Sequence, residues 1–341
     1  MLDQSLSAFV RQLRVATMVM LLSVALPAVA VPVVATDVTP VHSLVSQVMD
    51  GVGEPSLVIQ RGASPHSYSM RPSEAAALEN AHVVFWVGEE LTPWLDRALG
   101  SLAPDARQVA LLHTEGTRRH AFRERVLTDM VDHDDHDHDH GAEEHDAHDH
   151  GDHAAEVDGH HDHAGHAHEG IDPHAWLDPV NARYWLGVIA ETLAEEDPAN
   201  AAIYRRNAEA GQAEIDGLVE QVRGEVSPVH EQAFIVFHDA YQYYERRFDM
   251  NTVGAISLSD ATDPSPAHIA DIREIVGEYD VQCVFAEPQF NPALVDTVLN
   301  GTSARTGVLD PLGSDIATGP DFYPTLIRQL TDRLVSCLGE G

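Results

Sequence analysis

From Val31 onward, short apolar runs alternate with longer segments in which apolar residues recur at helical spacing. Short apolar runs between turn residues are typical of buried strands, and the longer segments of amphipathic helices. The expected strands are residues 31–35, 57–59, 83–87, 109–112, 233–237, 252–256, 281–285 and 307–309. The expected helices are residues 41–49, 72–81 (capped by Ser73), 92–99, 179–196, 198–226, 240–247, 266–279, 292–304 and 323–338. Regular alternation of the two predicts mostly parallel sheets flanked by helices.

The helix at residues 198–226 divides this pattern into two similar halves. It would be about 40 Å long at 1.5 Å per residue, and much of its surface is polar. We therefore predict an α/β fold with two lobes, residues 31–197 and 227–341, joined by a long rigid helix. Each lobe would contain a mostly parallel sheet, and a ligand would bind in the cleft between the lobes.

The alternation is interrupted at residues 129–170, which consist mainly of Asp, His, Gly and Ala. Thirteen histidines fall between Asp132 and His168, without a single Lys or Arg. So few apolar residues cannot form a core, so we predict a disordered loop. The loop is either a solvated acidic segment or a low-affinity reservoir that captures metal ions near the cleft, and we favour the reservoir.

The formal net charge of −35 excludes binding to nucleic acid or to an anionic membrane by charge. At the N-terminus, Arg11 and Arg14 precede an apolar run that ends at the small residues Ala28 and Ala30. This pattern is typical of a signal peptide over residues 1–30, and a buried strand or a membrane anchor is the alternative. The mature protein is therefore expected to be soluble outside the cytoplasm.

The chain has only two cysteines, Cys283 and Cys337. In an oxidising compartment a pair of cysteines predicts a disulfide. The alternative is a pair of metal ligands, which the absence of CxxC spacing disfavours.

Four candidate metal ligands lie at or near the ends of expected strands: His66, His174, His238 and Asp310. Ligands of open α/β sheets bind at the carboxyl ends of the strands, so a site between the lobes could collect all four. Three imidazoles and one carboxylate suit tetrahedral zinc, although copper and nickel also accept imidazole.

Five segments resemble those of the zinc-binding proteins of bacterial ABC importers, the ZnuA type. They are GASPHSYSMRPSEA (62–75), DPHAWLDP (172–179), FHDAYQYYERRF (237–248), CVFAEPQF (283–290) and GVLDPLG (307–313). The resemblance implies a periplasmic solute-binding protein that captures Zn2+ and delivers it to an ABC permease in the inner membrane. It implies His66, His174, His238 and Asp310 as the ligands.

A histidine-rich loop and a cysteine pair such as Cys283 with Cys337 are also features of that family. Glu287 could support a ligand in the family's cleft, or it could be a solvated loop carboxylate. Manganese-type relatives carry a carboxylate at the position of His238, which favours zinc here.

Two alternatives accompany this interpretation. One is a manganese-type protein of the same family. The other is a zinc hydrolase, with Glu287 as the base. Asp310 would close the open coordination position that a hydrolase needs, and no HExxH motif is present. We therefore expect a monomeric binding protein without enzymatic activity.

Overall fold

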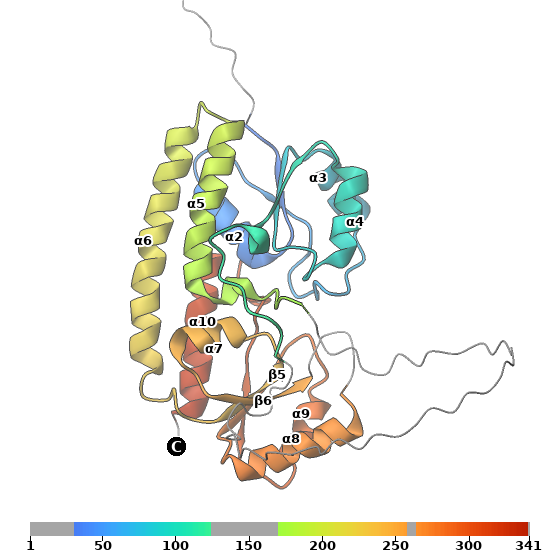
Figure 1. The fold of residues 1–341 in the computed structure, drawn as a ribbon, viewed down its shortest axis with the longest axis vertical. Helices are drawn as coiled ribbons and strands as arrows, with labels where there is room; N and C mark the ends of the chain where they lie inside the picture. Colours follow the sequence, from blue (N-terminus) through green and yellow to red (C-terminus); the bar gives the residue numbers. More distant parts are fainter. Residues whose placement is uncertain (1–30, 124–169, 258–263, 340–341) are drawn as a thin grey trace, which may run out of the picture. The chain divides into compact units, whose positions relative to one another are not determined.

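The computed structural model describes residues 31–123, 170–257 and 264–339 (Figure 1). The expected signal peptide lies outside these residues, as does nearly all of the expected histidine-rich loop. The described residues from Pro32 onward form one compact unit. None of the helices described here is both long and apolar enough to cross a membrane.

The first sheet consists of four parallel strands in the order β2-β1-β3-β4. Its strands are β1 (Val34–Thr36), β2 (Ser56–Leu57), β3 (Val83–Trp86) and β4 (Arg107–Ala110), and its connecting helices are α2 (Thr39–Val48), α3 (Pro72–Glu79) and α4 (Pro93–Leu102). Every residue of the central strand β3 is buried. A continuous apolar sequence is what a parallel strand covered on both faces requires.

The second sheet repeats the arrangement in the order β6-β5-β7-β8, again all parallel. Its strands are β5 (Phe234–His238), β6 (Thr252–Ser257), β7 (Cys283–Ala286) and β8 (Arg305–Val308), and its helices are α7 (Gln242–Phe248), α8 (Pro266–Glu278), α9 (Ala293–Leu299) and α10 (Phe322–Leu338). The predicted two-lobed α/β fold is therefore confirmed. The lobe boundaries at residues 197 and 227 stay a prediction.

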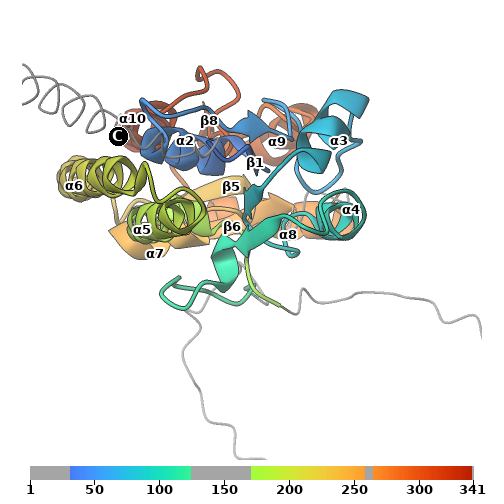
Figure 2. The ribbon, with the colours of Figure 1, turned by 90° about the horizontal axis from the view of Figure 1, so that it is seen from above.

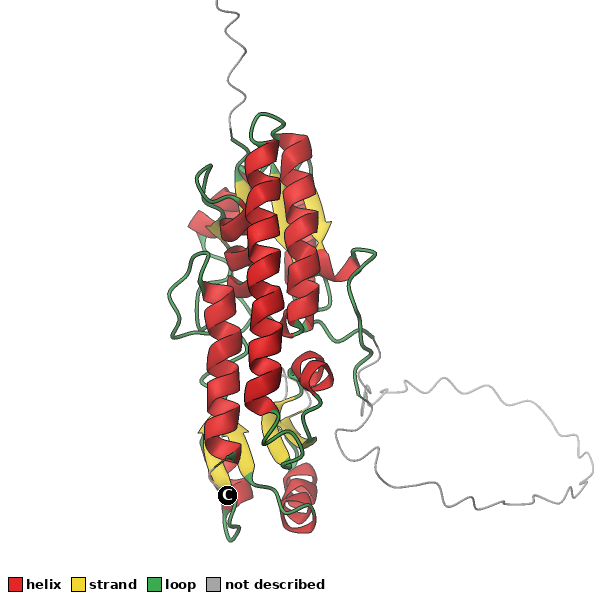
Figure 3. Ribbon diagram, turned by 90° about the vertical axis from the view of Figure 1, so that its left-hand side faces the viewer, coloured by secondary structure: helices red, strands yellow, loops and turns green. Residues whose placement is uncertain are grey.

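Two long helices, α5 (Pro179–Glu196) and α6 (Ala201–Val226), pack side by side and connect the two halves (Figures 1 and 2). Helix α6 also contacts α2 and α10, and it extends from the level of the first sheet to that of the second (Figure 3). Gly211 permits this packing, because a Cβ there would lie 2.9 Å from Leu186 Cδ1.

One apolar core contains side chains from α2, α5, α6 and α10 together with Phe85 of the first sheet and Phe234 and Phe285 of the second. A smaller core, which includes Ile235 and Val284, lies beneath α8 and α9. One continuous apolar core therefore reaches from the first half into the second.

Most helix ends differ from the predictions by a few residues, and three helices show why. Helix α3 is capped by Glu74, which accepts from the Arg71 amide at 2.7 Å, and Ser73 lies inside the helix. Helix α6 begins at Ala201, because Asp197 accepts from Asn200 Nδ2 at 2.7 Å and organises a turn before it. Helix α9 ends at Leu299, and Gly301 beyond it takes a φ of 85° that a continuing helix cannot use.

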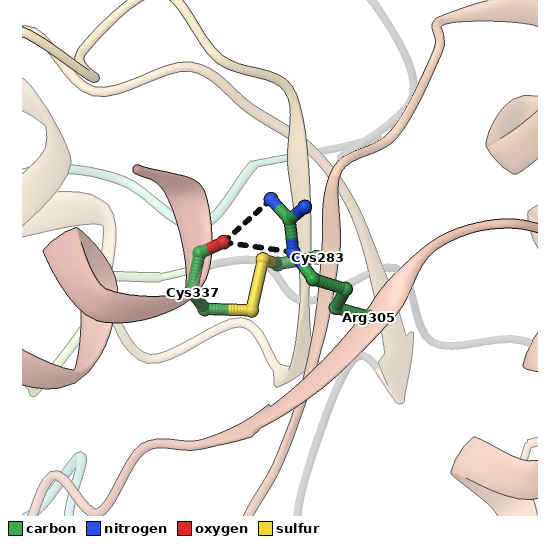
Figure 4. The surroundings of a disulfide bond; sticks show 3 residues. All are labelled: Cys283, Arg305 and Cys337. Carbon is green, nitrogen blue, oxygen red and sulfur yellow. Dashed lines mark hydrogen bonds between the residues drawn. A yellow bond between two sulfur atoms is a disulfide. The ribbon is translucent and has the colours of Figure 1, made fainter. Parts of the chain in front are cut away.

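Cys283 and Cys337 form the expected disulfide, which joins β7 to the end of α10 (Figure 4). Arg305 of β8 donates from Nε and Nη2 to the Cys337 carbonyl at 3.0 and 2.6 Å. The last turn of α10 is thus attached to two adjacent strands.

Candidate metal centre

The structure brings three of the predicted ligands together. His66 lies in the loop between β2 and α3, His174 begins the 3-10 turn Ala175–Leu177, and His238 is the last residue of β5. The ring centroid of His174 lies 5.7 Å from that of His66 and 5.3 Å from that of His238. The three residues line one cavity of about 10 Å³, roughly the volume of one water-sized sphere.

His174 is oriented by Asp172, a fully buried carboxylate two residues before it. Asp172 Oδ1 accepts from the His174 amide at 2.9 Å and lies 2.8 Å from His174 Nδ1. An imidazole that donates Nδ1–H to a carboxylate carries its lone pair on Nε2. The local Asp-Pro-His sequence therefore fixes Nε2 as the nitrogen able to bind a metal.

His238 is oriented in the same way by Glu287. Glu287 follows β7, the strand beside β5, and its Oε1 lies 2.7 Å from His238 Nδ1. Both residues are 4% exposed. Glu287 is thus a buried carboxylate in contact with a candidate ligand.

The loop that carries His66 is held by neighbouring elements of both halves. Trp94 of α4 donates from Nε1 to the Pro65 carbonyl at 2.8 Å, next to His66. Arg61 donates from Nη1 to the Ile316 carbonyl at 2.7 Å. The position of His66 therefore depends on contacts that span long sequence distances.

Asp310, the fourth predicted ligand, follows β8 and makes its own set of hydrogen bonds. It is absent from the cavity wall, and its oxygens accept four hydrogen bonds. Oδ1 accepts from the Leu312 amide and from Gln289 Nε2, both at 3.0 Å. Oδ2 accepts from the amide and hydroxyl of Ser314, at 2.6 and 2.5 Å. Gln289, which the sequence did not single out, lines the cavity between Asp310 and the histidines.

The ring separations can be compared with those of a zinc site. Two imidazoles on one tetrahedral zinc, with Zn–N near 2.1 Å, have centroids roughly 5 Å apart. The two measured separations come within an ångström of that value. Nevertheless, across residues 31–123, 170–257 and 264–339, no three His, Cys, Asp or Glu side chains are already arranged as a metal-binding group.

A second buried cluster lies behind His238. Arg123 Nη1 is 2.7 Å from Glu245 Oε2, and its Nε is 3.1 Å from Asp239, the residue after His238. Burial raises the pKa of Glu245, although the guanidinium of Arg123 opposes this effect. The cluster ties the segment before residue 124 to the turn that follows β5.

Residues 120–123 also contact the segment that contains Asp172, the carboxylate that orients His174. The Asp172 amide donates to the His120 carbonyl at 2.9 Å, and Ala121 and Ile171 form an antiparallel bridge. Tyr243 of α7 donates from its hydroxyl to the Asp172 carbonyl at 2.7 Å. The two ends of the segment that the structure leaves undescribed are thus joined beside the candidate site.

Comparison with known proteins decides the family. The model of the family described as "Zinc-uptake complex component A periplasmic" matches residues 33–337. The chain belongs to this family. A relative from Brucella suis, the high-affinity zinc uptake system protein ZnuA, is 46% identical over 323 residues, which cover 90% of this chain and 92% of the relative.

Several solved structures share the fold of this chain. A crystal structure of ZnuA has a TM-score of 0.67 at 19% identity and covers 90% of this chain and 99% of that one. A structure of FpvC from Pseudomonas aeruginosa in complex with Mn2+ has a TM-score of 0.71 at 18% identity, with coverage of 91% and 99%. At these identities the likeness concerns the fold alone.

Proposed function

We propose that this zinc-uptake family member captures one Zn2+ in the periplasm with His66, His174 and His238, and delivers it to an ABC permease in the inner membrane. The main observation in support is that two buried imidazoles are paired with carboxylates. His174 Nδ1 lies 2.8 Å from Asp172 Oδ1, and His238 Nδ1 lies 2.7 Å from Glu287 Oε1. Such pairs fix the tautomer and raise the basicity of a ligating histidine. No bond is made or broken in this function.

The donor set favours zinc over manganese. Imidazole nitrogen suits zinc, copper and nickel, whereas manganese prefers carboxylate, carbonyl and water oxygens. The Mn2+ complex of FpvC shares the fold with this chain, so the manganese-type alternative is tested directly by competition. Tighter binding of Mn2+ than of Zn2+ would contradict the proposal.

The size of the cavity favours a transported ion over an organic substrate. A space of about 10 Å³ holds one ion or one water molecule. A hydrolase would need additional room for an ester or a peptide beside the metal. The acidic charge of −35 also attracts cations and repels nucleic acid.

Zinc titration of the full chain in competition with a high-affinity chelator tests the proposal. His66→Ala, His174→Ala and His238→Ala should each weaken the tight site at least 100-fold, whereas His230→Ala, outside the cavity, should not. Zinc binds the neutral form of imidazole. The affinity for zinc should therefore decrease when the pH is lowered below about 6.5, the ordinary pKa of imidazole. Unchanged affinity in all three variants would refute the proposed site.

A further inference from the structure

Gln289 is a further polar residue that lines the cavity of the three histidines. It follows β7, lines the cavity together with His66, His174 and His238, and donates from Nε2 to Asp310 Oδ1 at 3.0 Å. A carboxylate oxygen only accepts, so the NH2 group of the amide must be the one directed at Asp310. This contact fixes which way the amide points.

The other end of the amide has no donor within the residues that the structure describes. Gln289 Oε1 is buried, and no protein group donates to it there. A buried acceptor without a donor costs about 1–3 kcal/mol, and such groups in folded proteins usually mark a bound water, ion or ligand. We therefore expect Gln289 Oε1 to accept a hydrogen bond from a group that enters the cavity together with the zinc ion.

Asp310, in contrast, has its acceptor capacity in use. Its four hydrogen bonds come from Gln289, Leu312 and Ser314 and stabilise the turn after β8. Two more contacts hold this turn in place: Thr39 Oγ1 donates to the Leu312 carbonyl at 2.9 Å, and Trp176 Nε1 donates to the Pro311 carbonyl at 3.0 Å. Direct ligation by Asp310 would break part of this network.

We propose that Gln289 completes the zinc site by accepting, at Oε1, a hydrogen bond from a water molecule in the fourth coordination position. Asp310 then acts as a positioning residue, because it holds the Gln289 amide. Water on a divalent cation is polarised and is a strong donor. This inference rests on the proposed function and replaces Asp310 as the expected fourth ligand.

The test compares Gln289→Leu, Asp310→Asn and the double variant in the full chain, with zinc affinity measured by chelator competition. Gln289→Leu should weaken binding about tenfold, the size of one buried hydrogen bond to a polarised donor. Asp310→Asn should weaken binding no more than Gln289→Leu does. The double variant should match Gln289→Leu, since the two residues act in series.

The absorption spectrum of the Co2+-loaded protein provides a second readout, and it should stay four-coordinate in Asp310→Asn. A loss of more than 100-fold in Asp310→Asn, or additive losses in the double variant, would overturn the inference. If a variant fails to fold, a crystal structure of the zinc-loaded wild type decides between a water near Gln289 and a bound Asp310 oxygen. A wild type that binds no zinc would instead refute the proposed function.

Discussion

His238 and Glu287 stand at the carboxyl ends of neighbouring strands, and Nδ1 of the histidine lies 2.7 Å from Oε1 of the glutamate. The two residues are 49 positions apart in sequence. The parallel pairing of β5 with β7 brings them together, so the fold itself sets the orientation of this imidazole.

Replacing Glu287 by Gln should therefore weaken zinc binding about 10–100-fold, the usual effect of losing such a partner. Gln keeps an acceptor for Nδ1–H but removes the charge that makes the ring more basic. Chelator competition measures the change. Glu231→Gln, an exposed site with the same loss of charge, should bind zinc like the wild type, and equal affinities in the two variants would contradict the prediction.

Arg123→Met should destabilise the protein by about 3–5 kcal/mol, because it leaves Asp239 and Glu245 buried without their counter-charge. Urea unfolding of the zinc-free protein measures this loss. Arg183→Met, which removes an exposed pair with Asp216, should change stability by less than about 1 kcal/mol.

Adding Asp239→Asn and Glu245→Gln to Arg123→Met should recover much of the lost stability, because no charge is then buried alone. If the triple variant is as unstable as the single one, the guanidinium matters for packing and not for charge.

Asp37 predicts a pH dependence of stability. Complete burial raises the pKa of this carboxyl from 3.8 to about 7, even though the Val38 and Val87 amides donate to it. The folded state then binds its proton more tightly than the unfolded state does. The contribution of this carboxyl to the free energy of unfolding is therefore fully present below about pH 4 and is lost as the pH rises toward 7.

The difference in unfolding free energy between the wild type and Asp37→Asn should consequently shrink as the pH rises from 4 to 7. The pKa difference corresponds to at most roughly 4 kcal/mol. Urea unfolding of both proteins at several pH values provides the measurement, and a constant difference would show that the carboxyl does not titrate in this range.

Loss of the disulfide should destabilise the protein by about 4 kcal/mol, since it closes a loop with a sequence separation of 54 residues. Thermal unfolding of the double variant Cys283→Ser/Cys337→Ser should match that of the reduced wild type. A reductant should have no effect on the variant. If the wild type keeps its melting temperature on reduction, the entropic estimate is wrong for this loop.

Deletion of residues 132–168 should leave one tight zinc site and lower the total number of zinc ions bound. The prediction follows from the thirteen histidines of that segment, whereas the proposed ligands lie outside it. Metal analysis together with chelator competition would separate the two effects. Disappearance of the tight site would place it in the deleted segment.

The sequence predicted the eight strands and the positions of the three histidines, because strand ends and apolar runs are local features. It offered Glu287 as a possible partner of a ligand, but it did not predict which residue orients which histidine. Asp172 was identifiable in principle, since an Asp that accepts from the amide two residues on is a local motif. Gln289 and Arg123 were not, because their partners are 21 and 116 residues away and follow only from the packed fold.

The shared core along α2, α5, α6 and α10 has a consequence for delivery. Swinging the two sheets apart would expose that apolar surface to water. We therefore expect the proposed ion to leave by displacement of short segments such as the one bearing His66. Loaded and empty proteins would then have almost the same outline. A permease that binds only the zinc-loaded protein would then have to recognise the conformation of one or two surface loops.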